Sequence, residues 1–339
     1  MTYLMVLGGL ILLFIGGEAL VRGSVSVARR LNISELVIGL TLVGFGTSVP
    51  ELVTSLRAIG QDAVGIAVGN VVGSNIANIL LVLGLAAVIR PILTNPRALA
   101  RDGMIMLGVT ALLCALIWFD MFTRPMGVGL LGLLLAYLAY SFIADQRRDS
   151  DAAAMHAAEG EVVEANYGLV VGLLIALGGL VGVILGARLL VDGGVVIARD
   201  LGISETVIGL TIVAVGTSLP ELVTSVVAAY RGKSDVALGN IIGSNIFNVL
   251  GILGITAVVH PFTLRGDIAA EAMSQGRASS IISSTDIGAL ILSVFLLMLF
   301  AMTGKRIARW EGAVLLLAYG LYFGLLFDLI PVPGIIAYG

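Results

Sequence analysis

Charged residues are scarce in this chain: they make up 12% of its 339 residues, whereas soluble domains carry about a quarter. Cysteine occurs once, as Cys114, which excludes an internal disulfide and a cysteine-ligated metal cluster. The net charge of −3 is too small to indicate nucleic acid or another strongly charged partner, and no obligate protein partner is expected. Hydrophobic residues make up 58%, so the sequence predicts an all-α integral membrane protein with lipid as its main surroundings.

Long apolar runs fill most of the chain. A membrane-spanning helix needs about 20 mostly apolar residues, and ten segments meet this requirement. The first run lacks a basic stretch before it and is too long for a secretory signal, so it is interpreted as the first span. The ten predicted spans lie approximately at 3–28, 34–59, 65–89, 103–119, 125–143, 167–190, 204–229, 236–259, 285–303 and 311–329.

The second half of the chain repeats the first. Residues 46–55 read GTSVPELVTS and residues 216–225 read GTSLPELVTS. A gapless alignment of 31–91 with 201–261 has 34 identities in 61 positions, which indicates two homologous halves of five helices each. Because five is odd, the second half must start from the opposite face of the membrane. The two repeats are therefore inverted, as in many secondary transporters.

The predicted chain has three parts. Residues 1–143 form the first five-helix repeat, 144–166 form a hydrophilic linker, and 167–339 form the second repeat. The side of the membrane that holds both termini carries 6 basic residues, and the other side carries 13. By the positive-inside rule both termini lie outside the cell and the linker is cytoplasmic. The expected location is the inner (plasma) membrane of a bacterium or archaeon.

Each half places a proline and a glutamate inside an apolar run. Pro50 and Pro220 have no amide hydrogen and clash with the carbonyl four residues before them, so we expect helices 2 and 7 to be broken there. In hydrocarbon, irregular backbone is tolerated only where it is buried in protein or lines a cavity. Ionised Glu51 and Glu221 would be costly at membrane depth, and neither has a lysine or arginine beside it in its own helix. The simplest partner is a cation from solution.

Neutral side chains whose oxygen atoms can bind a cation, here called oxygen donors, accompany both glutamates. Two hydroxyl residues precede each proline, and the following helix, GNVVGSNIANI at 69–79 or GNIIGSNIFNV at 239–249, adds a serine and an asparagine spaced i, i+4 on one face. Oxygen ligands of these kinds suit Ca²⁺, Na⁺ or K⁺, and the lack of soft ligands disfavours Zn²⁺ and Cu⁺. The donors are Thr47, Ser48, Ser74 and Asn78 in the first half, and Thr217, Ser218, Ser244 and Asn248 in the second.

The same residues also have purely structural interpretations. A proline can simply kink a helix, membrane hydroxyls bond their own backbone, asparagines join helices, and a protonated glutamate can bond between helices. A cation site is favoured because all these features recur together and in register in both halves. A passive cation channel would use the same oxygens. An intramembrane hydrolase is disfavoured, because the sequence has no HExxH motif and neither of its histidines belongs to the repeated motifs.

In these motifs the sequence resembles the calcium/cation antiporter superfamily, in its prokaryotic Na⁺/Ca²⁺ exchanger branch. GTSVPELVTS with GNVVGSNIANI, and GTSLPELVTS with GNIIGSNIFNV, match the two alpha-repeats of that family, here at 41–79 and 211–249. The resemblance implies a secondary active antiporter rather than an enzyme, without a cofactor, which transports Ca²⁺ and Na⁺ by alternating access. It also implies that helices 1 and 6 slide across a core of helices 2, 3, 7 and 8.

The resemblance further implies cation sites near the membrane centre. Glu51 and Glu221 are the principal carboxylates, the eight donors named above surround them, and the carbonyls of Gly44 and Ala214 are implied Na⁺ ligands. Asn248 stands where some prokaryotic exchangers carry an aspartate. Two carboxylates neutralise one Ca²⁺ but leave a charge of +1 with three Na⁺, so the ion ratio stays open. K⁺ and H⁺ also stay open as driving ions, although the proton-coupled branch typically has an acid in the helix after the break, and the motifs GNVVGSNI and GNIIGSNI of this chain contain none.

Overall fold

A computed structural model describes residues 2–146, 167–201, 214–264, 283–303 and 305–326. The chain divides into two compact units, and each unit is described by itself. Unit 1 consists of Met1–Ser48 and Leu135–Gly243, and unit 2 consists of Val49–Leu134 and Ser244–Gly339. Each unit thus contains segments of both sequence repeats. Most of the predicted linker, residues 147–166, lies outside the described residues.

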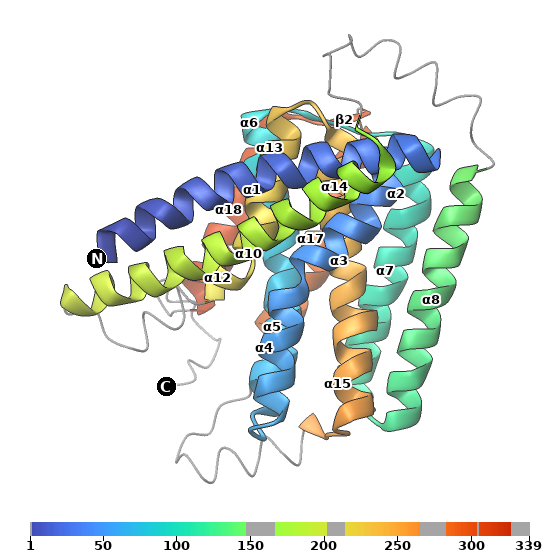
Figure 1. Cartoon of the computed structure of the whole chain (residues 1–339). Helices are drawn as coiled ribbons and strands as arrows, with labels where there is room; N and C mark the ends of the chain where they lie inside the picture. The colour runs from blue at the N-terminus through green and yellow to red at the C-terminus, as the bar shows by residue number, and fades with distance from the viewer. Residues whose placement is uncertain (1, 147–166, 202–213, 265–282, 304, 327–339) are drawn as a thin grey trace. The chain divides into compact units, whose positions relative to one another are not determined.

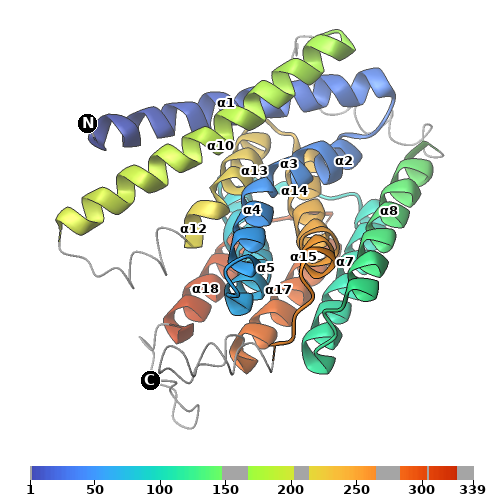
Figure 2. The ribbon, with the colours of Figure 1, turned by 60° about the horizontal axis from the view of Figure 1, so that its bottom comes forward.

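Unit 1 contains two long helices, α1 (Thr2–Leu31) and α10 (Leu169–Asp200), which lie side by side in both views (Figures 1 and 2). The span predicted at 167–190 ends ten residues before α10 does, because the helix continues through the polar residues Asp192 and Arg199. The shorter elements of unit 1 are α2 (Glu35–Ile38), the π-helix η1 (Gly39–Val43), α3 (Gly44–Thr47), α12 (Ala214–Thr217), α13 (Leu219–Tyr230) and most of α14 (Ser234–Phe247).

Glycines bring the backbones of α1 and α10 into direct contact. Gly9 faces Gly186 and Gly16 faces Gly179, so the two helices run antiparallel. A Cβ atom added at Gly179 would lie 2.3 Å from the backbone nitrogen of Leu20, where no side chain fits. Small residues at such contacts are a common means of helix association in membranes, where apolar side chains gain nothing by leaving lipid.

The predicted second span is interrupted at Ser48. This residue forms a turn between α3 and the helix α4 (Val49–Ile59), and Pro50 is the second residue of α4. A proline in the first turn of a helix removes no hydrogen bond, because the first amides have no partner within the helix. Ser218 separates α12 from α13 in the same way, with Pro220 second in α13.

The two interruptions have nearly the same backbone geometry. Ser48 has φ −82° and ψ 7°, and Ser218 has φ −89° and ψ 6°. Both lie in the sparsely populated bridge region of backbone space. The decapeptides that recur in the sequence thus recur as a local structure.

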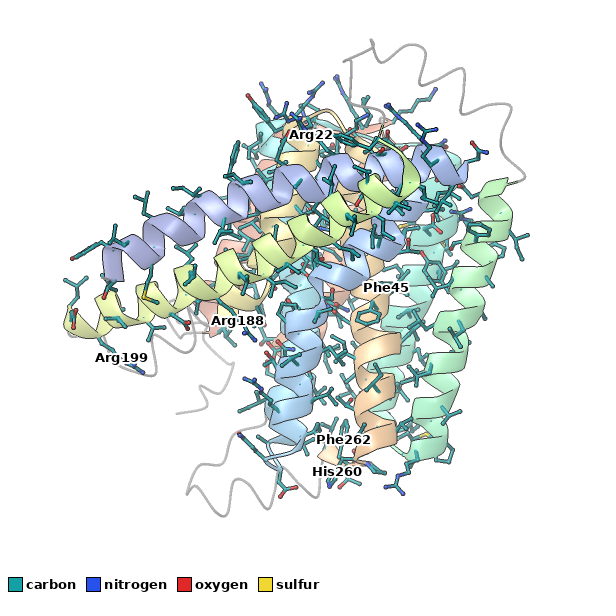
Figure 3. The ribbon with its side chains drawn as sticks, in the orientation of Figure 1. Arg22, Phe45, Arg188, Arg199, His260 and Phe262 are labelled. Carbon is teal, nitrogen blue, oxygen red and sulfur yellow. The ribbon has the colours of Figure 1, made fainter. Side chains whose placement is uncertain are left out.

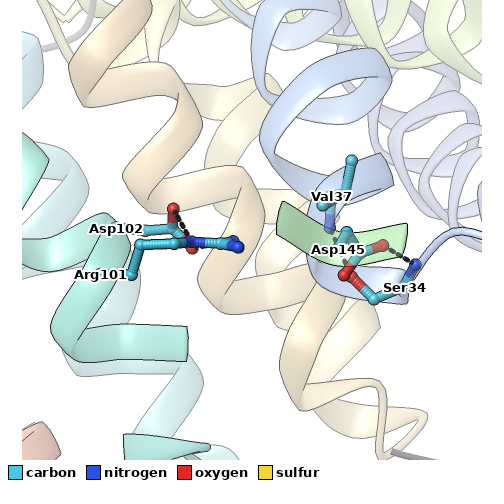
Figure 4. A network of polar contacts seen from close by, with 5 residues as sticks. All are labelled: Ser34, Val37, Arg101, Asp102 and Asp145. Carbon is cyan, nitrogen blue, oxygen red and sulfur yellow. Dashed lines mark hydrogen bonds and ion pairs between the residues drawn. The ribbon is translucent and has the colours of Figure 1, made fainter. Parts of the chain in front are cut away.

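The start of α2 is held by polar contacts (Figure 4). Ser34 is the N-cap of this helix: its Oγ accepts from the amide of Val37 at 3.3 Å, and its own amide donates to Asp145 Oδ2 at 2.6 Å. Glu35 lies in the first turn and pairs with Lys233 across 3.1 Å. These contacts give Glu35 a structural role at the start of α2, where the helix dipole stabilises an acidic side chain.

Unit 2 is also helical. Its elements are α4, α5 (Val64–Ala77), the π-helix η2 (Asn78–Leu83), α6 (Gly84–Ile89), α7 (Pro96–Phe119), the first half of α8 (Arg124–Gln146), the π-helix η4 (Asn248–Ile252), α15 (Leu253–Val259), α17 (Ser284–Thr303) and α18 (Arg309–Leu326). A short β-pairing departs from the all-α prediction: the two-residue strands β1 (Ile92–Leu93) and β2 (Arg306–Ile307) pair antiparallel.

Unit 2 contains a close glycine contact and an aromatic stack. A Cβ added at Gly312 of α18 would lie 2.7 Å from the carbonyl oxygen of Gly84 in α6. Phe122 and Phe262 stack with ring centroids 4.6 Å apart next to the end of α15, where Phe262 and His260 lie together (Figure 3). His260 is the exposed C-cap residue of α15.

Among the described residues, seven helices are long and apolar enough to span a membrane, or eight if Glu35–Thr47 and Val49–Ile59 form one span. Large apolar side chains point outward on the long helices: Phe14 is 61% exposed and Leu174 is 64% exposed. Polar and acidic side chains lie inside, with Glu51 and Glu221 each 1% exposed. Because this distribution reverses that of a water-soluble protein, the fold confirms a helical membrane protein.

Candidate functional site

Glu221 lies in the first turn of α13, within unit 1, and is buried. Ser48 Oγ donates a hydrogen bond to its Oε1 at 3.0 Å, and its Oε2 has no hydrogen-bond partner among the described residues. None of the ion pairs formed between described residues involves Glu221. A buried carboxylate that a hydroxyl orients and that no described basic residue neutralises is suited to bind a cation.

Asn240 of α14 connects Glu221 with Thr47. Its Nδ2 donates to the backbone carbonyl of Glu221 at 3.3 Å and to Ser225 Oγ at 2.8 Å. Its Oδ1 accepts from Thr47 Oγ1 at 3.1 Å. The sequence interpretation did not select Asn240 or Ser225, although the recurrence of GN at 69–70 and 239–240, and of LVTS at 52–55 and 222–225, was available as a signal.

Glu51 occupies the corresponding place in unit 2, in the first turn of α4. Asn70 of α5 donates from its Nδ2 to the backbone carbonyl of Glu51 at 3.1 Å and to Ser55 Oγ at 3.0 Å. This is the arrangement that Asn240 makes with Glu221 and Ser225. The two glutamates are therefore held by the same kind of contact in each unit.

Asn248, also in unit 2, begins the π-helix η4, and Asn78 begins the π-helix η2. Asn248 Nδ2 donates to Asn75 Oδ1 at 3.0 Å, and Asn75 Nδ2 donates to the carbonyl of Asn245 at 3.3 Å. Among the described residues, Asn248 Oδ1 and both polar side-chain atoms of Asn78 have no hydrogen-bond partner, although both residues are buried. A buried polar atom without a partner costs about 1–3 kcal/mol, which a bound cation can offset at the two oxygens.

The remaining predicted ligands lie at or next to the interruptions and in the following helices. Thr47 and Ser48 are fully buried, and the carbonyl of Gly44 accepts from the Ser48 amide and from Thr47 Oγ1, each at 3.3 Å. Ala214 is the first residue of α12. The others are Thr217 at the end of α12, Ser218 at the second interruption, Ser74 in α5 and Ser244 in α14.

Glycines of α14 allow close packing within unit 1. A Cβ added at Gly243 of α14 would lie 2.3 Å from the carbonyl oxygen of Leu40 in η1, and one at Gly239 would lie 2.6 Å from the carbonyl oxygen of Leu36 in α2. Helix α14 of the second repeat thus packs on the interrupted helix of the first.

The long apolar helices and the buried carboxylates with their oxygen-bearing neighbours define a helical membrane protein of the ion-handling class. The Sodium/calcium exchanger protein family matches residues 1–143 and 171–327, and the chain belongs to this family.

Individual relatives agree with this assignment. The sodium/calcium exchanger MaX1 of Methanosarcina acetivorans is 35% identical over 360 residues, with 96% of this chain and 98% of that protein covered. The inner membrane protein YrbG of Escherichia coli is 36% identical over 254 residues, with 75% and 78% covered. Among solved structures, the sodium-calcium exchanger NCX_Mj, soaked with zero Na⁺ and Ca²⁺, superposes with a TM-score of 0.77 at 36% identity, covering 96% of this chain and 98% of that one.

Proposed function

We propose that this protein is a secondary active antiporter that exchanges Na⁺ for Ca²⁺ across the membrane. The observation that carries the proposal is the buried Glu221 carboxylate, which accepts a bond from Ser48 and forms no ion pair with a described basic residue. Relatives that bear the name sodium/calcium exchanger over nearly the whole chain support it.

Both ions can use the same ligands, because Ca²⁺ and Na⁺ both prefer oxygen. The proposed Ca²⁺ and Na⁺ ligands are the side chains of Glu51 and Glu221, the eight hydroxyl and amide donors predicted with them, and the carbonyls of Gly44 and Ala214. Coupling follows from competition: an ionised carboxylate without a cation is costly at membrane depth, so the protein changes state readily only when an ion is bound. This makes inward movement of Na⁺ drive outward movement of Ca²⁺.

The finer architecture is part of this proposal. It comprises ten spans, two inverted repeats, helices 2 and 7 broken because of Pro50 and Pro220, both termini outside, and a cytoplasmic linker at 144–166. The similar geometry of Ser48 and Ser218 supports the repeat relationship. Inversion matters for function because each repeat then contributes the same motif from the opposite membrane face, as alternating access needs.

The test is Ca²⁺ uptake into proteoliposomes loaded with Na⁺, with the Na⁺ gradient as the only driving force. We expect Glu51→Gln and Glu221→Gln each to abolish uptake, because each removes one of the two charges that balance Ca²⁺. Glu35→Gln is the control, since Glu35 lies in the first turn of α2 and pairs with Lys233. Near-normal uptake by either of the first two variants would disprove the assignment.

The same vesicles distinguish a Na⁺/Ca²⁺ exchanger from a passive channel and from an antiporter driven by another ion. A passive channel would admit Ca²⁺ with no Na⁺ on either side, whereas an exchanger requires the counter-ion. K⁺ and pH gradients imposed separately identify a different driving ion. Asn248 is the residue that makes this comparison necessary, because an amide there leaves only two carboxylates among the proposed ligands.

A further inference from the structure

Two asparagines outside the proposed ligand set hold the glutamate-bearing helices in the same manner. In unit 1, Asn240 of α14 donates to the carbonyl oxygen of Glu221 and to the hydroxyl of Ser225, one helical turn further along α13. In unit 2, Asn70 of α5 donates to the carbonyl oxygen of Glu51 and to the hydroxyl of Ser55. Asn240 is completely buried. We call each of these arrangements an asparagine clamp.

Each clamp joins a helix directly to the backbone of a carboxylate residue. A helix carbonyl has two lone pairs, of which the bond within the helix uses one, so the amide adds a second bond without disturbing the helix. The contact falls in the first turn after the interruption at Ser218 or Ser48, where a helix lacks preceding turns to hold it. A clamp therefore limits how far the carboxylate can shift or rotate when the cation bound to it changes.

The Asn240 clamp also sets the direction of a hydroxyl hydrogen. Thr47 Oγ1 lies 3.1 Å from Asn240 Oδ1 and 3.3 Å from the carbonyl oxygen of Gly44, and both neighbours are acceptors. Thr47 must therefore act as the donor in either contact. With its hydrogen used in this way, both lone pairs of the Thr47 oxygen remain available to a cation.

We propose that Asn240, with Asn70 as its counterpart, is a positioning residue for cation binding. Asn240 fixes the Glu221 backbone through its amide hydrogens and orients the Thr47 hydroxyl through its amide oxygen, and Asn70 fixes the Glu51 backbone. Neither asparagine contacts the ion. The inference rests on the proposed exchange function, because it assigns these residues to the placement of that function's ligands.

The experiment measures Na⁺-driven Ca²⁺ uptake by wild type and by Asn240→Ala, and reads both the KM for Ca²⁺ and the Na⁺ concentration that halves Ca²⁺ binding. Displacement of a binding group by about 1 Å can cost about a hundredfold, so we expect the KM for Ca²⁺ to rise about tenfold or more. The control is Thr256→Ala, which removes another fully buried polar group, one that bonds only to carbonyls of its own helical segment. The control should lower thermal stability but leave the KM for Ca²⁺ unchanged.

Asn70→Ala makes the same test in the first sequence repeat, and it provides the test variant if Asn240→Ala does not fold. An unchanged KM for Ca²⁺ in a folded asparagine variant overturns the inference, and so does the failure of both variants to fold when Thr256→Ala folds, because the asparagines would then be structural. If wild type itself shows no Na⁺-driven uptake, the proposed function fails instead. Parallel wild-type and Glu221→Gln vesicles therefore distinguish the two failures.

Discussion

Ser48 donates a hydrogen bond to Glu221 across 3.0 Å, although 173 residues separate them in sequence. Each residue comes from the GTSxPELVTS motif of a different repeat, and both belong to unit 1. The turn residue of one motif thus orients the carboxylate of the other. The following predictions begin from this contact.

Replacement of Ser48 by alanine should weaken Ca²⁺ binding without unfolding the protein. A hydrogen bond to a charged group contributes about 1.5–3 kcal/mol, and each 1.4 kcal/mol corresponds to about tenfold in affinity. We therefore expect Ser48→Ala to raise the dissociation constant for Ca²⁺ about tenfold or more, as measured by calorimetry on the purified protein. Ser293→Ala is the control, because its fully buried hydroxyl bonds only to the Leu290 carbonyl. Equal Ca²⁺ affinities of the two variants would contradict the prediction.

The contact between α1 and α10 should be intolerant of added atoms at one glycine and tolerant at its neighbour. A Cβ at Gly179 would lie 2.3 Å from the Leu20 nitrogen, whereas a Cβ at Gly178 would have nothing within 4 Å. Because overpacking a tight contact costs about 1–3 kcal/mol, Gly179→Ala should lower the thermal midpoint by several degrees. Gly178→Ala, on the same helix, should leave it unchanged. The measurement is thermal unfolding in detergent, and similar midpoints would argue against this packing.

An aspartate at position 248 should favour Ca²⁺ over Na⁺. A carboxylate about 4 Å from a cation contributes about 4 kcal/mol per unit charge at an effective dielectric constant of 20, so the attraction is twice as large for Ca²⁺. Desolvation and loss of the bond from Asn248 to Asn75 offset part of it. We expect Asn248→Asp to lower the KM for Ca²⁺ and to require more Na⁺ for Ca²⁺ release. Asn248→Ala loses the same bond without adding charge, so an equal effect in both variants would rule out the electrostatic explanation.

Removal of Ca²⁺ should lower the stability of the folded protein. A ligand present at a hundred times its dissociation constant adds about 2.7 kcal/mol to the free energy of unfolding, so chelation should reduce the thermal midpoint measurably. Glu221→Gln should abolish this difference between Ca²⁺ and chelator, whereas Glu35→Gln should retain it. A Ca²⁺-dependent midpoint in Glu221→Gln equal to that of wild type would exclude Glu221 as a ligand.

Much of the candidate site could be predicted from the sequence because its motifs occur twice in the chain. The proline, the glutamate and the Ser/Asn pair each recur at an offset of 170 residues, and a buried charge in an apolar run is visible without coordinates. Asn70 and Asn240 were equally repeated but were not selected, because an asparagine in a membrane helix commonly joins helices. Only their bonds to Glu51 and Glu221 distinguish them from such residues.

The π-helices were not predicted at all. They begin at Asn78 and at Asn248, the same position of each repeat, and η1 precedes Gly44. Single π-helical turns are often found at functional sites, but they have no compositional signature that separates them from α-helix. Their positions depend on packing against neighbouring helices, which local sequence does not contain.

The sequence by itself determined that lipid surrounds the protein, that its motifs occur twice, and which polar side chains lie within apolar segments. These properties depend on the composition and order of residues. A chain with 58% hydrophobic residues needs lipid around it, and the charge of a glutamate within an apolar run must be balanced by a partner. Only the tertiary structure decided that Ser48 bonds Glu221, that Asn240 holds Glu221 and Thr47 together, and that Gly179 meets Leu20. The contacts of Ser48 with Glu221, of Thr47 with Asn240 and of Gly179 with Leu20 join helices far apart in the chain, and the bond from Asn240 to Glu221 joins two successive helices. The geometry of each contact is set by how the helices pack, which residue order alone does not express.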